Sequence, residues 1–398
     1  MIERRFSVEY AQRVLFTRGV LDVKNTTLRD LLASAMDGAR VTKALAFVDA
    51  HVLAANPALL NLLDTYAAAH ADVFTLAAPA AVIAGGEPCK NDFALVQQCW
   101  QAINDAGLDR HSFVFVIGGG AMLDLVCFAA ATAHRGIRHV RFPTTTLSQG
   151  DGGVGVKNGV NYFGKKNWVG SFAVPYAIVN DFAFLDSLPV REKRCGLIEA
   201  IKVALIRDAT FYGWLEANAD ALASLKSEAV EYTVQRSAEL HVEHIATSGD
   251  PFEQGSARPL DFGHWVAHKL EQVSHFAIAH GEAVAIGMAV DLLYSVKANL
   301  LDAATAHRVL ALIERVGFNT YDAKLLQHNE RGADIILAGL EEFREHLGGE
   351  LTITLVPEIG RKIEVHEMDT RLIIDAVEEL RDRAGLSGYE TASSVACP

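Results

Sequence analysis

Residues 111–136 read HSFVFVIGGGAMLDLVCFAAATAHRG, and this stretch decides the fold of the first half of the chain. Residues 111–120, with the apolar run FVFVI, are typical of a strand that is buried on both faces of a sheet and runs into three glycines. Three glycines, Gly118 to Gly120, then lead into an apolar run at 121–136 that predicts a helix. Strand, glycine turn and helix in this order indicate one unit of a parallel α/β sheet.

The same alternation extends upstream and then stops. Residues 44–52, ALAFVDAHV, predict a buried strand that ends at Asp49, and residues 92–107 predict a helix. After about Leu185 the pattern becomes almost wholly helical. We therefore expect three parts along the chain. They are an α/β domain over 1–185, an all-α domain over 186–388 and a flexible tail over 389–398.

Composition narrows the class of protein. The chain has 398 residues, of which 50% are hydrophobic and 21% are charged, so it is globular. A formal net charge of −13 argues against a nucleic-acid partner. The N-terminus lacks the apolar core of a signal peptide and no apolar stretch is long enough to span a bilayer, so we expect a cytoplasmic protein with no membrane partner. Five cysteines without a CxxC spacing fit reduced thiols there: Cys89, Cys99, Cys127, Cys195 and Cys397.

The glycine run ending at Gly120 is a candidate phosphate-binding turn. Glycine leaves backbone N–H groups accessible, and the positive end of the following helix dipole favours an anion such as pyrophosphate. Asp49 at the end of the other strand can hold a ribose hydroxyl, and the loop around Glu87 and Lys90 adds polar groups. A tight strand-to-helix turn without a ligand is the alternative.

Residues 142–172 form the second polar stretch, FPTTTLSQGDGGVGVKNGVNYFGKKNWVGSF. Its glycines let backbone approach a ligand closely, and its lysines match negative charge, so it favours a phosphate-bearing ligand. The alternative is an ordinary β-hairpin with exposed lysines. The polar residues in question are Thr144, Thr145, Asp151, Lys157, Lys166 and Asn167.

Three helical segments in the second half carry metal-binding residue types. They are CGLIEAIKVALI with Glu199, LDFGHWVAHKLE with His264 and His268, and IAHGEAVAIGM with His280. One carboxylate and at least two imidazoles suit a catalytic zinc with an open coordination position. His268, four residues after His264, could be a fourth ligand, a proton shuttle or a packed helix residue, and we favour a role on the substrate side.

These motifs resemble one family in register. The chain is similar to the sugar-phosphate cyclases related to 3-dehydroquinate synthase in a series of motifs that follow in the same order. They are GGE before Lys90, GGG before Asp124, PTT with LSQGDGG, VGVKNGVN, GKKNWVGSF, GLIEAIK, DFGHWVAH and HGEAVAIGM. The resemblance runs from about Asp49 to beyond Pro357. It implies an N-terminal nucleotide-binding α/β domain and a C-terminal α-helical domain that binds metal and substrate, with the active site in the cleft between them.

The resemblance also implies roles for residues. Glu199, His264 and His280 match the metal ligands, with zinc the expected ion and cobalt or another divalent metal the alternative. The positions that match NAD contacts are Asp49, Glu87, Lys90, Gly119, Gly120, Asp124, Thr144 and Thr145. Those that match substrate and phosphate contacts are Asp151, Lys157, Lys166, Asn167 and Lys202. Arg135 matches an arginine that reaches into the neighbouring subunit's site, which implies a homodimer.

The implied reaction uses NAD without consuming it. NAD oxidises a ring hydroxyl, phosphate leaves by elimination, the hydride returns, and an intramolecular aldol step closes a carbocycle. The metal assists as a Lewis acid at the oxidised position. We expect direct catalytic roles for Asp151, Lys157, Lys202, Asp261 and His268.

The substrate is where the chain departs from 3-dehydroquinate synthase. That enzyme recognises a substrate carboxylate with an upstream lysine, an arginine before an LLN-type run and a late lysine. Here His241 falls near the first position, Arg258 stands one residue closer to the histidine, and Asp261 replaces the asparagine. Glu345 or His346 occupies the late position.

An acidic residue in this place suits a substrate with hydroxyls instead of a carboxylate. ARPLDFGH and REHLGG are similar to the cyclases of sedoheptulose 7-phosphate, the valiolone synthase group, so we expect a heptulose 7-phosphate substrate held partly by Arg258 and His346. One alternative is 3-dehydroquinate synthase itself, acting on 3-deoxy-arabino-heptulosonate 7-phosphate. The others are an NAD-dependent polyol dehydrogenase of the glycerol dehydrogenase type and a binding protein without catalysis.

Overall fold

The computed structural model describes residues 1–36, 38, 40–252, 260–328, 332, 334–346 and 349–385. The chain divides into two units, which are described separately below. Unit 1 comprises Met1–Lys193 with His241–Phe252, and unit 2 comprises Arg194–Leu240 with Glu253–Pro398. The boundary near Leu185 stays a prediction, and the tail expected at 389–398 lies outside the described residues.

Unit 1 is built on a sheet whose strands all pair in parallel. The strands run in the order β1-β9-β6-β5-β2-β3, and β4 also pairs with β2. Their bounds are β1 (Val14–Thr17), β2 (Thr42–Asp49), β3 (Phe74–Leu76), β4 (Ala81–Ile83), β5 (Phe113–Gly118), β6 (Arg138–Pro143) and β9 (Ala177–Asp181).

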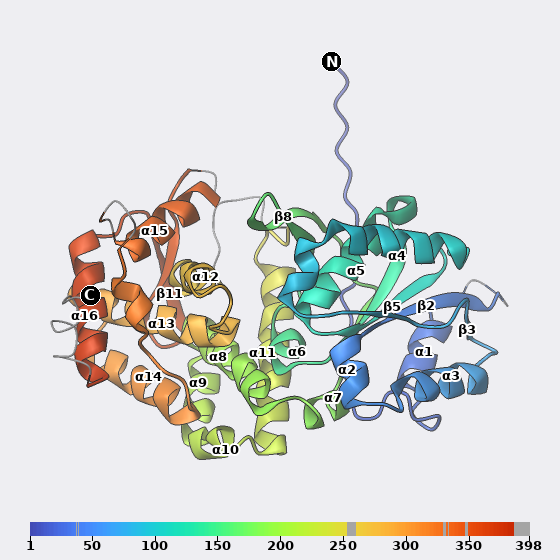
Figure 1. Ribbon diagram of the computed structural model, residues 1–398, viewed down its shortest axis with the longest axis horizontal. Helices are drawn as coiled ribbons and strands as arrows, with labels where there is room; N and C mark the ends of the chain where they lie inside the picture. The colour runs from blue at the N-terminus through green and yellow to red at the C-terminus, as the bar shows by residue number, and fades with distance from the viewer. Residues whose placement is uncertain are drawn as a thin grey trace, which may run out of the picture. The chain divides into compact units, whose positions relative to one another are not determined.

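Both faces of this sheet are covered, which explains why its strands are apolar throughout. Phe113 and Phe115 of β5 face one apolar cluster, whereas Val114 and Val116 face the other. Figure 1 shows α1 and α3 on one side of β2 and β5, with α4 and α5 on the other. The helices are α1 (Thr27–Ala33), α2 (Ala50–Ala55), α3 (Leu59–Ala69), α4 (Phe93–Asp105) and α5 (Gly120–Thr132).

The strand order reverses between β2 and β5. From β2 the chain adds β3 and β4 on one side, whereas β5, β6 and β9 lie on the other. Val48 is in register with Ile117, so Asp49 and Gly118 end adjacent strands at the same edge of the sheet. In open α/β sheets, ligands bind at such a switch point, outside the carboxyl ends of the strands.

Residues 157–172 form an antiparallel hairpin of β7 (Lys157–Tyr162) and β8 (Lys165–Phe172). Phe163 and Gly164 link the strands with φ of 52° and 69°, as a tight hairpin turn requires. Lys157 is exposed at the start of β7. This segment is therefore a β-hairpin, as one of the two expectations had it. Phosphate binding by its lysines stays a prediction.

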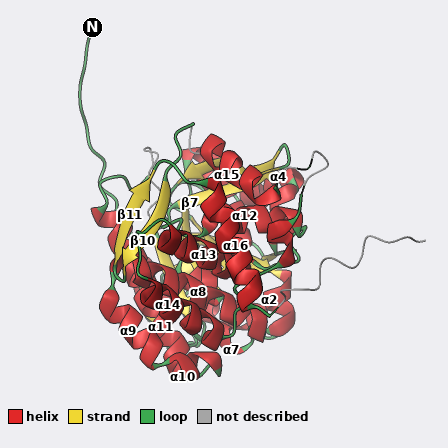
Figure 2. Cartoon of the chain, turned by 90° about the vertical axis from the view of Figure 1, so that its left-hand side faces the viewer, coloured by secondary structure: helices red, strands yellow, loops and turns green. Residues whose placement is uncertain are grey.

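Unit 2 is helical, which confirms the expected fold class of an α/β domain followed by a helical one (Figure 2). The chain crosses between the units within α8 (Val190–Arg207) and α11 (Ser227–Thr247). The other helices are α9 (Ala209–Ala217), α10 (Ala219–Ala223), α12 (His264–Val273), α13 (His280–Lys297), α14 (Ala303–Val316), α15 (Ile335–His346) and α16 (Thr370–Arg383).

Unit 2 also contains one element that the helical pattern does not predict. Strands β10 (Ile353–Glu358) and β11 (Arg361–Val365) form an antiparallel hairpin. The first four residues of β10, Ile353 to Val356, are all buried, and the connection contains Gly360 with φ of 87°. The expected all-α domain thus carries a short two-stranded sheet.

Two other segments, α8 and the start of α12, contact α13 closely at its glycines Gly281 and Gly287. A Cβ at Gly281 would lie 2.5 Å from the carbonyl oxygen of Cys195 on α8. A Cβ at Gly287 would overlap the backbone of Gly263, the residue before α12. Hydrogen atoms in place of side chains therefore let α8 and the start of α12 approach α13 at backbone contact.

Two further expectations concern membranes and thiols. No helix among the described residues is long and apolar enough to cross a membrane. Among the described residues, Cys89, Cys99, Cys127 and Cys195 are buried and form no disulfide.

The glycine contact on α13 predicts a stability difference between two substitutions. Gly287→Ala should lower the free energy of unfolding by about 1–3 kcal/mol, because its methyl group overlaps backbone that cannot swing away. Gly213→Ala, at an exposed position of α9 where a Cβ meets nothing within 4 Å, should be neutral or stabilising by up to about 1 kcal/mol. Thermal unfolding followed by circular dichroism compares them, and equal melting temperatures would contradict the close contact.

Candidate metal and cofactor site

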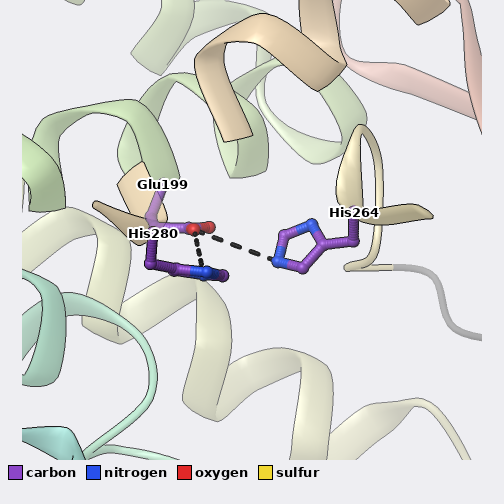
Figure 3. Close-up of side chains that lie close together, drawn as sticks. All are labelled: Glu199, His264 and His280. Atoms are coloured by element: carbon purple, nitrogen blue, oxygen red, sulfur yellow. Dashed lines mark ion pairs between the residues drawn. The ribbon is translucent and has the colours of Figure 1, made fainter. Parts of the chain in front are cut away.

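Glu199, His264 and His280 converge in unit 2 from three different helices. Glu199 lies in α8, His264 begins α12 and His280 begins α13. One ligand atom from each lies within 4.8 Å of the others. Figure 3 shows both imidazoles turned toward the Glu199 carboxylate, with Nε2 of His280 at 3.3 Å and Nε2 of His264 at 4.0 Å from Oε1.

Each imidazole uses its other nitrogen for a hydrogen bond away from the cluster. Nδ1 of His264 lies 3.1 Å from the carbonyl oxygen of Phe262, which can only accept, so Nδ1 carries the proton. Nδ1 of His280 lies 3.3 Å from Oε1 of Glu271. Both Nε2 atoms thus face Glu199 while both Nδ1 atoms face acceptors outside the cluster, the arrangement that metal-binding histidines have.

The protonation state of His264 suits a metal ligand. Burial and the nearby Lys202 ammonium lower the pKa of His264 to about 3, so its imidazole is neutral, as a metal ligand must be. Glu199 is buried and forms an ion pair with Lys202, which is buried one turn later on α8. A buried carboxylate requires such a positive partner, whether lysine or metal.

The other expected residues around this cluster differ in how far the structure describes them. The ring of His268 lies beside the group, with its centroid 5.6 Å from that of His264 and 6.5 Å from that of His280. The carbonyl of Asp261 accepts the backbone N–H of His264 at 2.9 Å. Arg258 lies outside the described residues, and His346 ends α15 with a side chain that the structure does not describe.

A buried carboxylate fixes the start of α12. Asp291, on α13, accepts hydrogen bonds from the backbone N–H of Gly263 and from Nε1 of Trp265, both at 2.9 Å. Burial raises the pKa of Asp291 to about 7. Its two hydrogen bonds hold the residues on either side of His264 against α13.

In unit 1, several residues expected to contact NAD gather at the switch point of the sheet. The backbone N–H of Thr144 donates to the carbonyl of Gly118 at 3.1 Å, and Thr145 caps α6 (Thr146–Gly150). A Cβ at Gly119 would lie 3.4 Å from the methyl group of Thr145. The carboxylate of Asp49 accepts the N–H of His51 at 2.8 Å and caps α2. The edge thus combines a glycine turn, a helix N-terminus and a carboxylate, as a dinucleotide site requires.

Lys90 joins this edge to the β7–β8 hairpin. Its buried ammonium lies 2.6 Å from Asp124 and 3.9 Å from Glu87, and it also donates to the amide oxygen of Asn167 on β8. Burial opposes the charge on Lys90, but Asp124 and Glu87 more than offset burial and raise its pKa. Asn161 strengthens the connection by donating to Glu87 and accepting the N–H of Asn167.

Asp151 also belongs to unit 1, where it pairs with His241, the residue near the family's upstream lysine position. Nδ1 of His241 lies 2.6 Å from Oδ1 of Asp151, and both side chains are less than one-fifth exposed. Arg135 is exposed in the turn after α5, where His134 and Arg135 have φ of 50° and 64°.

The sequence did not predict three contacts at these sites. They are Glu271 with His280, Asn161 with Glu87 and Asn167, and His241 with Asp151. Glu271 lies two turns after His264 on α12, and this spacing could have placed it on the metal-facing side of the helix. Asn161 and His241 find their partners only through tertiary contacts, for which the sequence carries no local signal.

Family models match most of the folded chain. The model of the 3-dehydroquinate synthase N-terminal domain matches residues 80–195, and that of the C-terminal domain matches residues 196–331. Among curated relatives, a 3-dehydroquinate synthase of Halorhodospira halophila is 33% identical over 82% of this chain and 91% of its own length. A 2-epi-5-epi-valiolone synthase of Streptomyces glaucescens is 35% identical over 69% of this chain and 70% of its own length.

A solved structure supports the same family relationship as the family models and the curated relatives. The 2-epi-5-epi-valiolone synthase of Streptomyces hygroscopicus subsp. jinggangensis 5008, solved with NAD+ and Zn2+ bound, superposes with a TM-score of 0.83 and 27% identity. The superposition covers 96% of this chain and 100% of that one. These matches extend across the glycine turn, the hairpin and all three residues of the candidate metal cluster. The chain belongs to the 3-dehydroquinate synthase family, and it is a sugar-phosphate cyclase of that superfamily, near the valiolone synthases.

Proposed function

We propose that this enzyme is an NAD- and zinc-dependent cyclase of sedoheptulose 7-phosphate. It would be a carbon-oxygen lyase that eliminates phosphate and closes a carbocycle. The observation that carries the proposal is the convergence of Glu199, His264 and His280, with both imidazoles offering Nε2. The related synthase with 27% identity was solved with NAD+ and Zn2+.

The donor set fits zinc. Three protein ligands of the types N, N and O leave a fourth coordination position for a substrate oxygen. Lys202 would lose part of its interaction with Glu199 when a divalent ion binds, which frees its ammonium for the substrate phosphate. Cobalt has similar preferences and would fit the same ligands.

The sheet edge of unit 1 fits NAD. Gly119 and Gly120 begin α5 without side chains that could block a pyrophosphate, and nothing lies within 4 Å of a Cβ built at Gly120. Asp49 stands at the adjacent strand end for a ribose hydroxyl, as the family pattern implies. Glu87, Lys90, Asp124, Thr144 and Thr145 complete the expected contacts.

The chemistry divides between the cofactors and the chain. Bound zinc would polarise a substrate oxygen, and bound NAD would accept and later return a hydride. Lys157, Lys166 and Asn167 on the hairpin would bind the phosphate and hold the sugar while these steps follow one another. We assign proton transfer to His268 and to Asp151, because the former ring lies beside the metal cluster and the latter carboxylate is paired with an imidazole.

Substrate choice follows from charge. His241 stands near the family's upstream lysine, and its imidazole is engaged by Asp151 at 2.6 Å, so its positive charge, when present, is already balanced. Asp261 adds a carboxylate three residues before His264. Both features disfavour a substrate carboxylate and suit the hydroxyls of sedoheptulose 7-phosphate.

We also propose a homodimer, in which Arg135 reaches the neighbouring active site. The exposed side chain of Arg135 and the successive left-handed conformations of His134 and Arg135 support this role. Such backbone conformations cost free energy and occur preferentially at functional sites.

Phosphate release without NADH distinguishes a cyclase from a polyol dehydrogenase. With sedoheptulose 7-phosphate and NAD, the zinc-loaded enzyme should release phosphate without accumulating NADH, because the hydride returns to the substrate. Phosphate assay and NADH fluorescence in the same cuvette measure both. His264→Ala should lose more than about 100-fold in phosphate release while retaining the wild-type circular dichroism spectrum. Accumulation of NADH in proportion to turnover would contradict the proposal.

A separate prediction concerns the carboxylated sugar. Wild-type enzyme should prefer sedoheptulose 7-phosphate to 3-deoxy-arabino-heptulosonate 7-phosphate in kcat/KM. His241→Lys should raise the relative kcat/KM for the carboxylated sugar by about tenfold, equivalent to about 1.4 kcal/mol, because it restores the upstream lysine of the 3-dehydroquinate synthase pattern. His241→Gln is the matched control and should not. A wild-type preference for the carboxylated sugar would contradict the proposal and indicate that the enzyme is a 3-dehydroquinate synthase.

A further inference from the structure

Glu271 is a buried carboxylate that lies against one of the three proposed metal ligands without belonging to the ligand group. It is 4% exposed, and its Oε1 lies 3.3 Å from Nδ1 of His280. His264 and Glu271 are seven residues apart on α12, so two helical turns place both on one side of the helix. One helix therefore contributes a proposed ligand and a partner for a second ligand.

The two proposed histidine ligands are oriented by different acceptors. His264 donates to a backbone carbonyl, that of Phe262, which no substitution of a side chain can remove. His280 donates to the side chain of Glu271, which substitution can remove. A carboxylate in this position fixes the imidazole tautomer and raises the basicity of the opposite nitrogen, which strengthens a metal bond.

The position of Glu271 relative to His280 is set by a short, tight connection. His275 and Phe276, between α12 and α13, both adopt left-handed conformations, with φ of 49° and 62°. The carbonyl of Glu271 accepts the N–H of Phe276 at 2.8 Å, and the Ser274 hydroxyl accepts the N–H of Ile278 at 3.3 Å. These hydrogen bonds reverse the direction of the chain after α12, so that His280, the first residue of α13, lies beside Glu271.

We propose that Glu271 is a positioning residue of the metal site. By accepting the Nδ1–H of His280, it holds that imidazole with Nε2 toward Glu199 before any ion binds. The role rests on the proposed metal ligands. It makes metal affinity depend on a residue that does not itself coordinate the ion.

Zinc affinity, measured by competition with a chromophoric chelator, tests the role without any assay of turnover. Glu271→Ala should bind zinc about 10–100-fold more weakly than wild type, which is typical of losing an outer hydrogen-bond partner of a ligand histidine. Glu271→Gln should lose less than Glu271→Ala, because the amide oxygen still accepts the Nδ1–H although its charge is gone. Glu342→Gln is the matched control and should keep wild-type affinity within about twofold. Glu342 also contacts α12, through Lys269 at 2.6 Å, but from an exposed position.

A second readout separates positioning from simple stability. In metal-free protein with 15N-labelled histidine, long-range 1H–15N spectra should show Nδ1 of His280 protonated in wild type and in Glu271→Gln. In Glu271→Ala the proton should move from Nδ1 to Nε2, which still has the Glu199 carboxylate at 3.3 Å as an acceptor. A merely structural role would lower the melting temperature without changing the tautomer.

Two results would overturn the role. One is zinc affinity of folded Glu271→Ala within about twofold of wild type. The other is an unchanged His280 tautomer in that variant. If wild type itself fails to bind zinc, the proposed metal site is wrong and this role falls with it, whereas equal binding by wild type and Glu271→Ala contradicts this role alone.

Discussion

The close contact of α8 and the start of α12 with α13 is the constraint on which the metal cluster depends. Backbone meets backbone at Gly281 with Cys195 and at Gly287 with Gly263. Because Glu199 follows Cys195 by one helical turn and His264 follows Gly263 directly, these contacts determine where two of the three side chains lie. Asp291 reinforces the second contact by binding the residues on both sides of His264.

Unit 1 reaches its own site by a different physical route. There the parallel sheet brings strand ends together, so Asp49 and Gly118 are neighbours because of register and strand order. Lys90 then connects this edge to the hairpin through Asp124 and Asn167. The buried ammonium of Lys90 would therefore lie near both a ligand at the sheet edge and a phosphate at the hairpin. Its positive charge would act on both expected sites.

The sequence predicts the parts of this arrangement that follow from periodicity and motif. The strand ending at Asp49 and the glycine turn after β5 are encoded locally, and the ligand types of Glu199, His264 and His280 indicate a metal site before any coordinates are known. Glu271 and His241 are different, because their roles depend on partners that only the fold brings near. The β10–β11 hairpin escapes prediction because its strands are short and lack an alternation of buried and exposed residues.

The most direct test of zinc at the crossing of these helices is X-ray absorption at the zinc edge, on protein loaded with one equivalent of the metal. We predict a first shell of nitrogen and oxygen only, with the multiple-scattering pattern of two imidazoles from His264 and His280. Cys195, one helical turn from Glu199, is the nearest sulfur along α8. A sulfur ligand in the first shell, or the absence of imidazole scattering, would contradict the proposed site.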